Sequence, residues 1–296
     1  MISPRAFGNC LRIALLFNAL QFVQCGGGSA VIVPLAASAR RDARPRPSVQ
    51  PRDVTVSLAS SVHLALGVPR DADPSDDQLL DEGVFVVSYS PVKRVPNWVA
   101  WRLDRSYLGR VRRSGDFRPD LLLPARLYRV NDGDYSHSGY DRGHLCPSAD
   151  RTASKADNKR TFLFTNIVPQ LHELNAGPWE GLEEYVRQRA RAGEVLYVVA
   201  GGVFQGPPRT IGNGVAVPAA NFKIVAVLHD GQGAKDLDVD TPLLAALMPN
   251  RPGVGEHDWT EYLTTVDAIE LATGYDFLSA VPEPIQRVLE ARVSRP

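Results

Sequence analysis

The order of turn, strand and helix signals between residues 139 and 192 constrains this chain more than any other feature. The tetrapeptide Asp141-Arg142-Gly143-His144 follows a turn-rich loop and is expected to lie on a strand. Residues 161–166 are dominated by aromatic and β-branched side chains and predict a second strand. Apolar residues then recur at helical spacing and, with Pro178 suited to a first turn, predict a helix over residues 178–192. We therefore expect a strand–strand–helix unit with a histidine on its first strand.

Strand signals on both sides of this unit predict a larger sheet. Apolar and β-branched runs are expected to form strands at residues 84–89, 97–103, 194–200 and 221–228, the third of which should end at Gly201-Gly202. In the second run, pleating predicts two opposite faces, namely Trp98, Ala100 and Arg102 against Val99, Trp101 and Leu103. Strands compatible with antiparallel pairing, together with a few helices, predict an α+β fold with a central antiparallel sheet flanked by helices.

Composition is typical of a globular protein and excludes a global electrostatic attraction for polyanions. Of 296 residues, 44% are apolar and 22% are charged, and the formal net charge is zero. A polyanion would therefore need a local basic cluster. Three cysteines exclude a dense disulfide framework, and Cys146 is expected to be a small buried side chain rather than a nucleophile.

The N-terminal residues predict a targeting segment for export, followed by a flexible linker. Residues 1–25 form a signal or targeting segment whose short apolar run is too interrupted to predict a membrane span. We interpret it as a secretion signal, so the protein is expected to be secreted or periplasmic. A lipid anchor at Cys25 stays open, as does mitochondrial import, because residues 1–39 lack acidic side chains. Residues 26–60 are rich in proline and arginine and predict a flexible linker before one domain at residues 61–296.

Four side chains supply what phosphodiester hydrolysis requires, which is a base for water and positive charge for the phosphate and the leaving oxygen. A neutral imidazole at His144 is a competent base near neutral pH. The amide oxygen of Asn175 suits Mg²⁺, which prefers oxygen ligands and retains several waters. Arg142 and Arg102 are able to hold the non-bridging oxygens as bidentate donors.

A carboxylate at Glu183 follows Asn175 by eight residues, which corresponds to about 80° around an α-helix. Both side chains would face one cleft if helical geometry ran back through Asn175. Pro178 argues against a continuous helix, because its ring would crowd the carbonyl group of Leu174.

These motifs resemble the DNA/RNA non-specific endonuclease family, the ββα-metal nucleases that include endonuclease G. The resemblance covers most of residues 61–285 and implies a ββα-metal nuclease fold. The motifs that carry it are Asp141-Arg142-Gly143-His144, Pro96-Asn97-Trp98, Thr165-Asn166-Ile167-Val168-Pro169-Gln170, Leu174-Asn175, Trp179, Leu182-Glu183, Thr265-Val266-Asp267-Ala268-Ile269-Glu270, Thr273-Gly274 and Phe277.

The resemblance implies roles for individual residues. His144 matches the general base, Asn175 the sole direct protein ligand of Mg²⁺, and Glu183 a carboxylate that orients metal-bound water. Arg142 and Arg102 match phosphate-binding arginines. Mn²⁺ is expected to substitute for Mg²⁺.

Two further positions match supporting residues of the family. Asn166 matches an asparagine that supports the histidine, and Asp141 an acidic residue beside the site with a structural role. Lys223 and Glu270 are expected to have structural or surface roles.

The predicted function is that of a Mg²⁺-dependent endonuclease that cleaves DNA and RNA with little sequence preference and leaves 5′-phosphate ends, as the family does. No helix-turn-helix or zinc finger is recognisable, which agrees with readout of the backbone rather than the bases. Two alternatives stay open: a non-catalytic nucleic-acid-binding protein on the same fold, and an interaction protein tethered to the envelope through Cys25. DNA and RNA are the expected partners, a homodimer is left open, and no small-molecule organic cofactor is expected.

Overall fold

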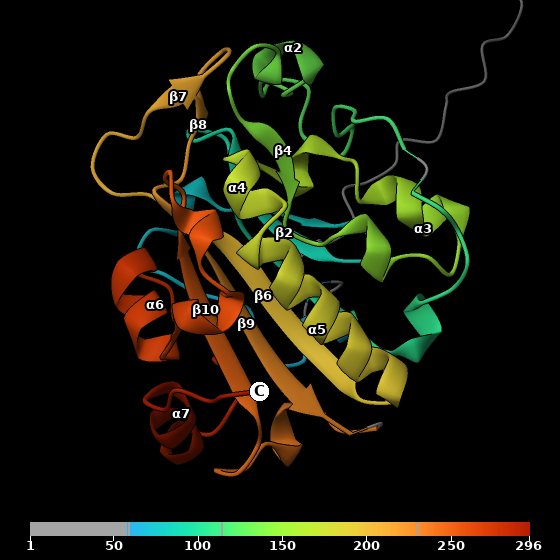
Figure 1. The fold of residues 1–296 in the computed structure, drawn as a ribbon, viewed down its shortest axis with the longest axis vertical. Helices are drawn as coiled ribbons and strands as arrows, with labels where there is room; N and C mark the ends of the chain where they lie inside the picture. Colours follow the sequence, from blue (N-terminus) through green and yellow to red (C-terminus); the bar gives the residue numbers. More distant parts are fainter. Residues whose placement is uncertain (1–57, 59, 114, 230) are drawn as a thin grey trace, which may run out of the picture. The chain divides into compact units, whose positions relative to one another are not determined.

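The computed structural model describes residue 58 and residues 60–113, 115–229 and 231–296 (Figure 1). The predicted targeting segment at residues 1–25, including Cys25, and nearly all of the predicted linker lie outside the described residues. Within the described part of the chain, no helix combines the length and the apolar content needed to span a membrane.

A seven-stranded antiparallel sheet forms the centre of the described domain (Figure 1). Its strands, in spatial order, are β1 (Gln78–Asp81), β2 (Val86–Ser90), β3 (Val95–Leu103), β6 (Val195–Val203), β9 (Ala220–Leu228), β10 (Leu243–Pro249) and β11 (Leu263–Thr264). Two short antiparallel pairs accompany it, β4 (Asp141–His144) with β5 (Ile167–Gln170) and β7 (Thr210–Ile211) with β8 (Val215–Ala216). The predicted antiparallel sheet is confirmed.

Helices are packed on both faces of this sheet, which confirms the predicted α+β class. The α-helices are α2 (Asp132–Tyr135), α3 (Lys155–Arg160), α4 (His172–Asn175), α5 (Pro178–Ala192), α6 (Val266–Thr273) and α7 (Glu283–Glu290). Short 3₁₀ helices are η1 (Val62–Leu64), η2 (Pro74–Asp76), η3 (Arg105–Tyr107), η4 (Ser148–Asp150), η5 (Phe164–Asn166), η6 (Ala234–Asp236), η7 (Val254–Glu256) and η8 (Trp259–Tyr262).

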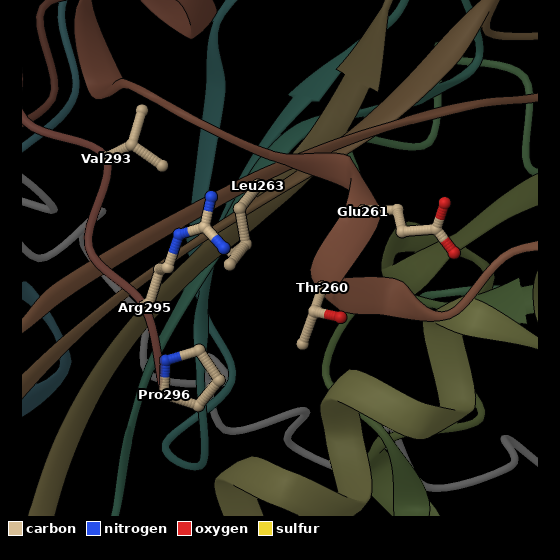
Figure 2. A pocket seen from close by; sticks show the side chains of 6 residues that line it. All are labelled: Thr260, Glu261, Leu263, Val293, Arg295 and Pro296. Carbon is tan, nitrogen blue, oxygen red and sulfur yellow. The ribbon is translucent and has the colours of Figure 1, made fainter.

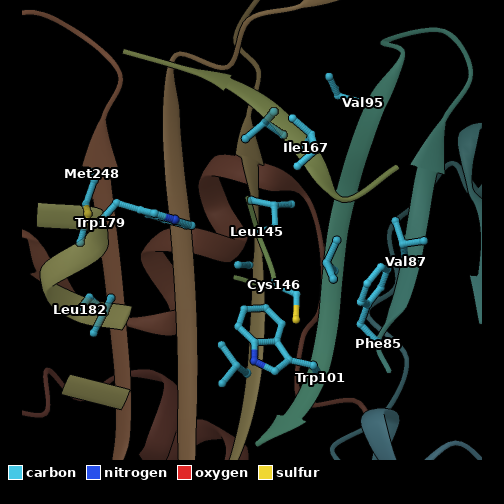
Figure 3. Packing of buried hydrophobic residues seen from close by; sticks show 14 of the residues in the cluster. Phe85, Val87, Val95, Trp101, Leu145, Cys146, Ile167, Trp179, Leu182 and Met248 are labelled. Atoms are coloured by element: carbon cyan, nitrogen blue, oxygen red, sulfur yellow. The ribbon is translucent and has the colours of Figure 1, made fainter. Parts of the chain in front are cut away.

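Side chains alternate across β3 as the sequence predicted, and the two faces belong to two different cores. Trp101 packs with Leu145 and Trp179 in the core between the sheet, the β4–β5 pair and α5 (Figure 3). Trp98 and Ala100 point to the opposite face, where the core also contains apolar residues of α6 and α7. The sheet therefore separates a β4–β5–α5 side from an α6–α7 side.

The strand predicted at residues 161–166 was wrong. These residues turn and end in η5, and the strand comes directly afterwards as β5. The N–H of Leu163 donates to Arg160 and that of Asn166 donates to Leu163, so turns satisfy much of this backbone, and only an isolated bridge with Arg118 pairs it with another segment. Apolar composition alone cannot separate such a buried turn from a buried strand.

The predicted end of the third run at Gly201-Gly202 was also wrong, because β6 continues through both glycines to Val203. A Cβ atom at Gly201 would lie 2.3 Å from the carbonyl oxygen of Asn97 and 2.7 Å from the ring of Phe222. The glycine is therefore a site of close packing inside the strand rather than the end of it.

The helical segment that follows β5 consists of two helices rather than one. The predicted helix over residues 178–192 is confirmed as α5, with Pro178 in its first turn and Gly193 ending it at a φ of 105°. Asn175 ends the separate short helix α4, and the chain turns at Gly177 before α5 begins. The argument from Pro178 against a continuous helix is thus confirmed.

Candidate active site

Strand β4 and helix α5 together fix the backbone of His144. The histidine lies opposite Ile167 in the antiparallel register of β4 and β5. Its carbonyl oxygen accepts a hydrogen bond at 3.1 Å from Nε1 of Trp179, which is buried in the first turn of α5. Because this bond is shielded from water, it holds the strand firmly against the helix.

Asn166 holds the two residues that follow His144 rather than the imidazole itself. Its buried side chain accepts a hydrogen bond from the N–H of Cys146 at 2.9 Å and donates to the Cys146 carbonyl oxygen at 2.8 Å. A third bond, from Asn166 Nδ2 to the carbonyl oxygen of Thr161 at 2.9 Å, satisfies the rest of the amide. Cys146 is buried, and burial raises the pKa of its thiol to about 12, which disfavours the reactive thiolate.

The imidazole of His144 is buried and, among the described residues, one of its nitrogens has no hydrogen-bond partner. Its ring packs against Phe162 at 5.0 Å and Phe117 at 5.4 Å between centroids, and the residue is 7% exposed. Burial, and to a lesser degree the charge of Arg113, lowers the pKa of His144 to about 3. Among the described residues, the buried Nε2 has no hydrogen-bond partner, and in the tautomer that carries the ring proton on Nδ1 its lone pair is available to accept a proton.

Asn175 is oriented by a carboxylate on β4. Its Nδ2 atom donates to Asp141 Oδ2 at 3.0 Å, and the same oxygen is 2.8 Å from Nδ1 of His172. With the amide nitrogen held in this way, the amide oxygen of Asn175 is the atom left to bind a cation. The structure thus places Asp141 directly beside the predicted metal ligand.

Glu183 lies two turns into α5, within a buried network of charges. Its Oε2 is 3.6 Å from Nη1 of Arg187, and the same Nη1 is 3.3 Å from Asp150 Oδ1. Burial raises the pKa values of both Glu183 and Asp150, and nearby cations oppose that effect. Arg187 was not predicted, although its position four residues after Glu183 places both on one face of the helix.

The fourth member of this network is Lys223 on β9. The residue is 1% exposed, so a surface role is excluded, and its Nζ lies 3.5 Å from Glu183 Oε1. The ammonium group also sits 4.0 Å from the ring centroid of Trp179. Burial lowers the pKa of Lys223, while the carboxylates of Glu183 and Asp150 counteract the shift. This lysine fixes the position of the Glu183 carboxylate.

One cavity of about 200 Å³ brings most of the predicted site residues together. His144, Arg142, Asn175 and Glu183 all line it. Its remaining lining residues are Arg113, Pro147, Ser148, Ala149, Ala176, Glu180 and Arg187. Arg113 was missed because it lies in an irregular loop, where no periodic pattern indicates which way a side chain points.

The structure does not bring Arg102 to this cavity. Strand pleating places Arg102 on the same face of β3 as Trp98 and Ala100, which is the α6–α7 side of the sheet. Its Nε atom pairs with Asp104 Oδ2 at 2.9 Å. Arg113, rather than Arg102, lines the cavity beside Arg142.

A larger cavity, of about 670 Å³, lies elsewhere and lacks these groups (Figure 2). It is formed by Thr260, Glu261 and Leu263 together with Val293, Arg295 and Pro296 near the C-terminus. The Glu261 carboxylate points away from Arg295 and accepts hydrogen bonds near the start of η8 (Figure 2). Size alone therefore does not identify the reactive site.

The donor set of the 200 Å³ cavity fits a hard divalent cation. Asn175 offers an amide oxygen, and Glu180 and Glu183 offer carboxylates. Oxygen donors of this kind are the ligands that Mg²⁺ and Mn²⁺ favour. A strand carrying His144, its antiparallel partner strand and a following helical segment carrying Asn175 and Glu183, set beside a large antiparallel sheet, constitute the ββα-metal nuclease fold.

Comparison with known proteins agrees with this class. The family model described as DNA/RNA non-specific endonuclease matches residues 68–284. The chain is 42% identical over 247 residues to a nuclease from Nostoc sp., covering 80% of this chain and 88% of that protein. It is 32% identical over 220 residues to human mitochondrial Endonuclease G, covering 69% of this chain and 71% of that one.

A solved structure shares the fold. It is titled a crystal structure of the EndoG/EndoGI complex, and it matches with a TM-score of 0.63 and 24% identity over 74% of this chain and 91% of that chain. The family match spans well over half of the sequence. The chain therefore belongs to the DNA/RNA non-specific endonuclease family, as its motifs predicted.

Proposed function

We propose that this nuclease is a metal-dependent endonuclease that hydrolyses phosphodiester bonds of both DNA and RNA with little sequence preference. The observation that carries the proposal is the convergence of His144, Asn175, Glu183 and two arginines on one small cavity. A neutral base, oxygen donors for a cation and guanidinium groups for phosphate are the groups that such hydrolysis requires.

His144 is the proposed general base. It is neutral above about pH 3, and its open Nε2 would take a proton from water in the cavity. A low pKa makes the free imidazole a weak base. The negative charge of a bound phosphate raises the proton affinity of a neighbouring imidazole, so substrate binding would strengthen this base.

Arg142 and Arg113 are the proposed phosphate-holding side chains. Arg142 Nε pairs with Asp132 Oδ1 at 2.8 Å and its Nη2 donates to the Asp132 carbonyl oxygen at 3.3 Å, which leaves Nη1 for a ligand. Arg113 contributes positive charge at the His144 imidazole. Arg187 is already bound to Asp150 and Glu183, so its proposed role is to hold the Glu183 carboxylate.

Asn175 is the proposed protein ligand of the cation, with Glu183 orienting water in the same cavity. Mg²⁺ is the proposed ion and Mn²⁺ its substitute, because both accept amide and carboxylate oxygens and retain waters. When bound, the ion would neutralise charge on the phosphate and stabilise the leaving oxygen.

Location and domain organisation remain proposals, and the targeting segment and nearly all of the linker lie outside the described residues. We retain export, with a targeting segment at 1–25, a linker at 26–60 and the nuclease domain at 61–296. The mitochondrial description of human Endonuclease G supports the mitochondrial alternative. The EndoG/EndoGI complex suggests a protein inhibitor as one further class of partner.

Digestion of supercoiled plasmid and of a structured RNA, with and without EDTA, tests the proposed function. Both polymers should be cut, chelation should abolish cleavage, and added Mg²⁺ should restore it. Asn175→Ala should need much more Mg²⁺ than the wild-type protein. Full activity in EDTA would exclude the metal-dependent mechanism, and binding without cleavage would favour the non-catalytic alternative.

A further inference from the structure

A second group of oxygen ligands lies away from the catalytic cavity, between α6 and α7. Asp267 and Glu270 on α6 and Glu290 on α7 each present a carboxylate oxygen, and these three oxygens lie within 4.8 Å of one another. Asp267 and Glu270 are three residues apart and so occupy one face of α6. The cluster is on the α6–α7 side of the sheet, opposite the β4–β5–α5 side that carries the catalytic cavity.

The burial of Glu290 without a hydrogen-bond partner for one of its oxygens needs an explanation. Glu290 is 7% exposed, and among the described residues its buried Oε1 has no hydrogen-bond partner. A glutamate is rarely buried without a compensating partner, because taking the charge out of water is costly. Burial, then Glu270 and Asp267, raises the pKa of Glu290 to about 7.

The nearby charges all have the same sign. Among the described residues, no lysine, arginine or histidine forms an ion pair with Asp267, Glu270 or Glu290. Asp276 adds a further negative charge to the surroundings of both glutamates. Glu270 Oε1 accepts a hydrogen bond from the N–H of Phe277 at 3.0 Å, which leaves its other oxygen for the cluster. Among the residues that the structure describes, no positively charged side chain therefore pairs with these three carboxylates.

We propose that Asp267, Glu270 and Glu290 form a second, structural site for a divalent cation, and that its ion is Ca²⁺. Three carboxylates suit Ca²⁺, which takes about six to eight oxygen ligands in flexible geometry, better than Mg²⁺, which is usually held by one or two carboxylates and several waters. The three carboxylate oxygens all lie within 4.8 Å of one another, which is close enough for them to contact a single ion. Ligands that are all carboxylates also exclude the softer metals that select thiolate or imidazole.

The bound ion would join α7 to α6. Leu289, next to Glu290, is fully buried in the core on that face of the sheet, so the ion would secure the helix that covers this core. An ion that binds only the folded state raises the free energy of unfolding, by an amount that grows with the ion concentration relative to its dissociation constant. Binding of Ca²⁺ at this site would thus raise the stability of the nuclease domain, and the ion would contact none of the residues proposed for catalysis.

Thermal unfolding in EDTA and in millimolar CaCl₂ tests this site, using Asn175→Ala as the parent so that ion binding at the catalytic cavity is weakened and is the same in every variant compared. The Asn175→Ala protein should unfold at least ~3 °C higher with Ca²⁺. Adding Glu290→Gln or Asp267→Asn should remove that shift. Glu283→Gln is the matched control on α7, because Glu283 is exposed and pairs with Arg287 at 2.7 Å.

Glu290→Gln removes an uncompensated buried charge, so this variant should be at least as stable as its parent in EDTA. A persistent Ca²⁺ shift in Glu290→Gln, or no shift in the parent, would overturn the proposal. A shift with Mg²⁺ but not with Ca²⁺ would overturn the choice of ion. These readouts do not depend on nuclease activity, so they remain decisive even if the proposed function fails.

Discussion

Asp141 Oδ2 lies 3.0 Å from Nδ2 of Asn175, on the side of the amide group away from the oxygen proposed to bind the cation. Together with the contact of His172 Nδ1 to the same oxygen at 2.8 Å, this hydrogen bond links the first strand of the ββα unit to α4. It also fixes which end of the amide is available in the cavity. We therefore expect Asp141, which begins the motif, to act by orienting Asn175 rather than by contacting the substrate.

Asp141→Ala should raise the Mg²⁺ concentration needed for half-maximal cleavage by about 10–100-fold, the usual effect of removing a group that orients a metal ligand. The maximal rate at saturating Mg²⁺ should change much less. His172→Ala is the matched control, since His172 contacts the same Asp141 oxygen but is 81% exposed. An unchanged Mg²⁺ requirement in Asp141→Ala would show that Asn175 is oriented by other contacts.

Arg113→Ala should lower kcat/KM on DNA and RNA by about 10-fold or more, because charge-assisted bonds to phosphate are worth about 1.5–3 kcal/mol. Arg102→Ala should stay within about twofold of the wild type, as expected for a side chain on the other face of β3. Steady-state kinetics on one plasmid and one RNA measure both variants. A larger loss of kcat/KM in Arg102→Ala than in Arg113→Ala would indicate that Arg102, and not Arg113, contacts the substrate phosphate.

Sequence patterns predicted the parts of the site that local signals determine. The helix predicted at residues 178–192 is present at those bounds, because the first-turn position of Pro178 and the helical spacing of apolar residues agree. Positions matched by motif, including His144, Asn175 and Glu183, converge on one cavity. The alternation in β3 was also predicted, and that alternation already places Arg102 on the face away from the site.

The features of the fold and site that could not be predicted from the sequence depend on contacts between segments that are distant in the chain. Lys223 is indistinguishable in sequence from an exposed strand lysine, and only the packing of β9 under α5 buries it beside Glu183. Residues 161–166 have the composition of a strand, but contacts with neighbouring turns decide their conformation. Arg113 reaches the cavity from a loop that has no repeating pattern.

Acid should destabilise the protein partly through His144. Its folded-state pKa of about 3 is below the usual unfolded value of about 6.5, so the unfolded chain binds the extra proton as pH falls through this window. Stability from this group is therefore present near pH 7 and is lost progressively toward pH 3. Between pH 7 and pH 5 the wild type should lose about 2 kcal/mol more than His144→Gln.

Urea unfolding of the two proteins at pH 7 and pH 5 measures this difference. His63, whose pKa burial lowers to about 4, is present in both proteins, so its contribution cancels. Equal losses of stability in the two proteins would mean that the His144 imidazole is protonated in the folded state at pH 5.

The most direct test of the central claim is the turnover number of His144→Ala on plasmid DNA and on RNA at saturating Mg²⁺. Loss of the general base should lower kcat by at least ~10² on both polymers. Circular dichroism and the unfolding midpoint should show that the variant is folded. Near-native turnover by the folded variant would contradict the assignment of His144 as the base that activates water.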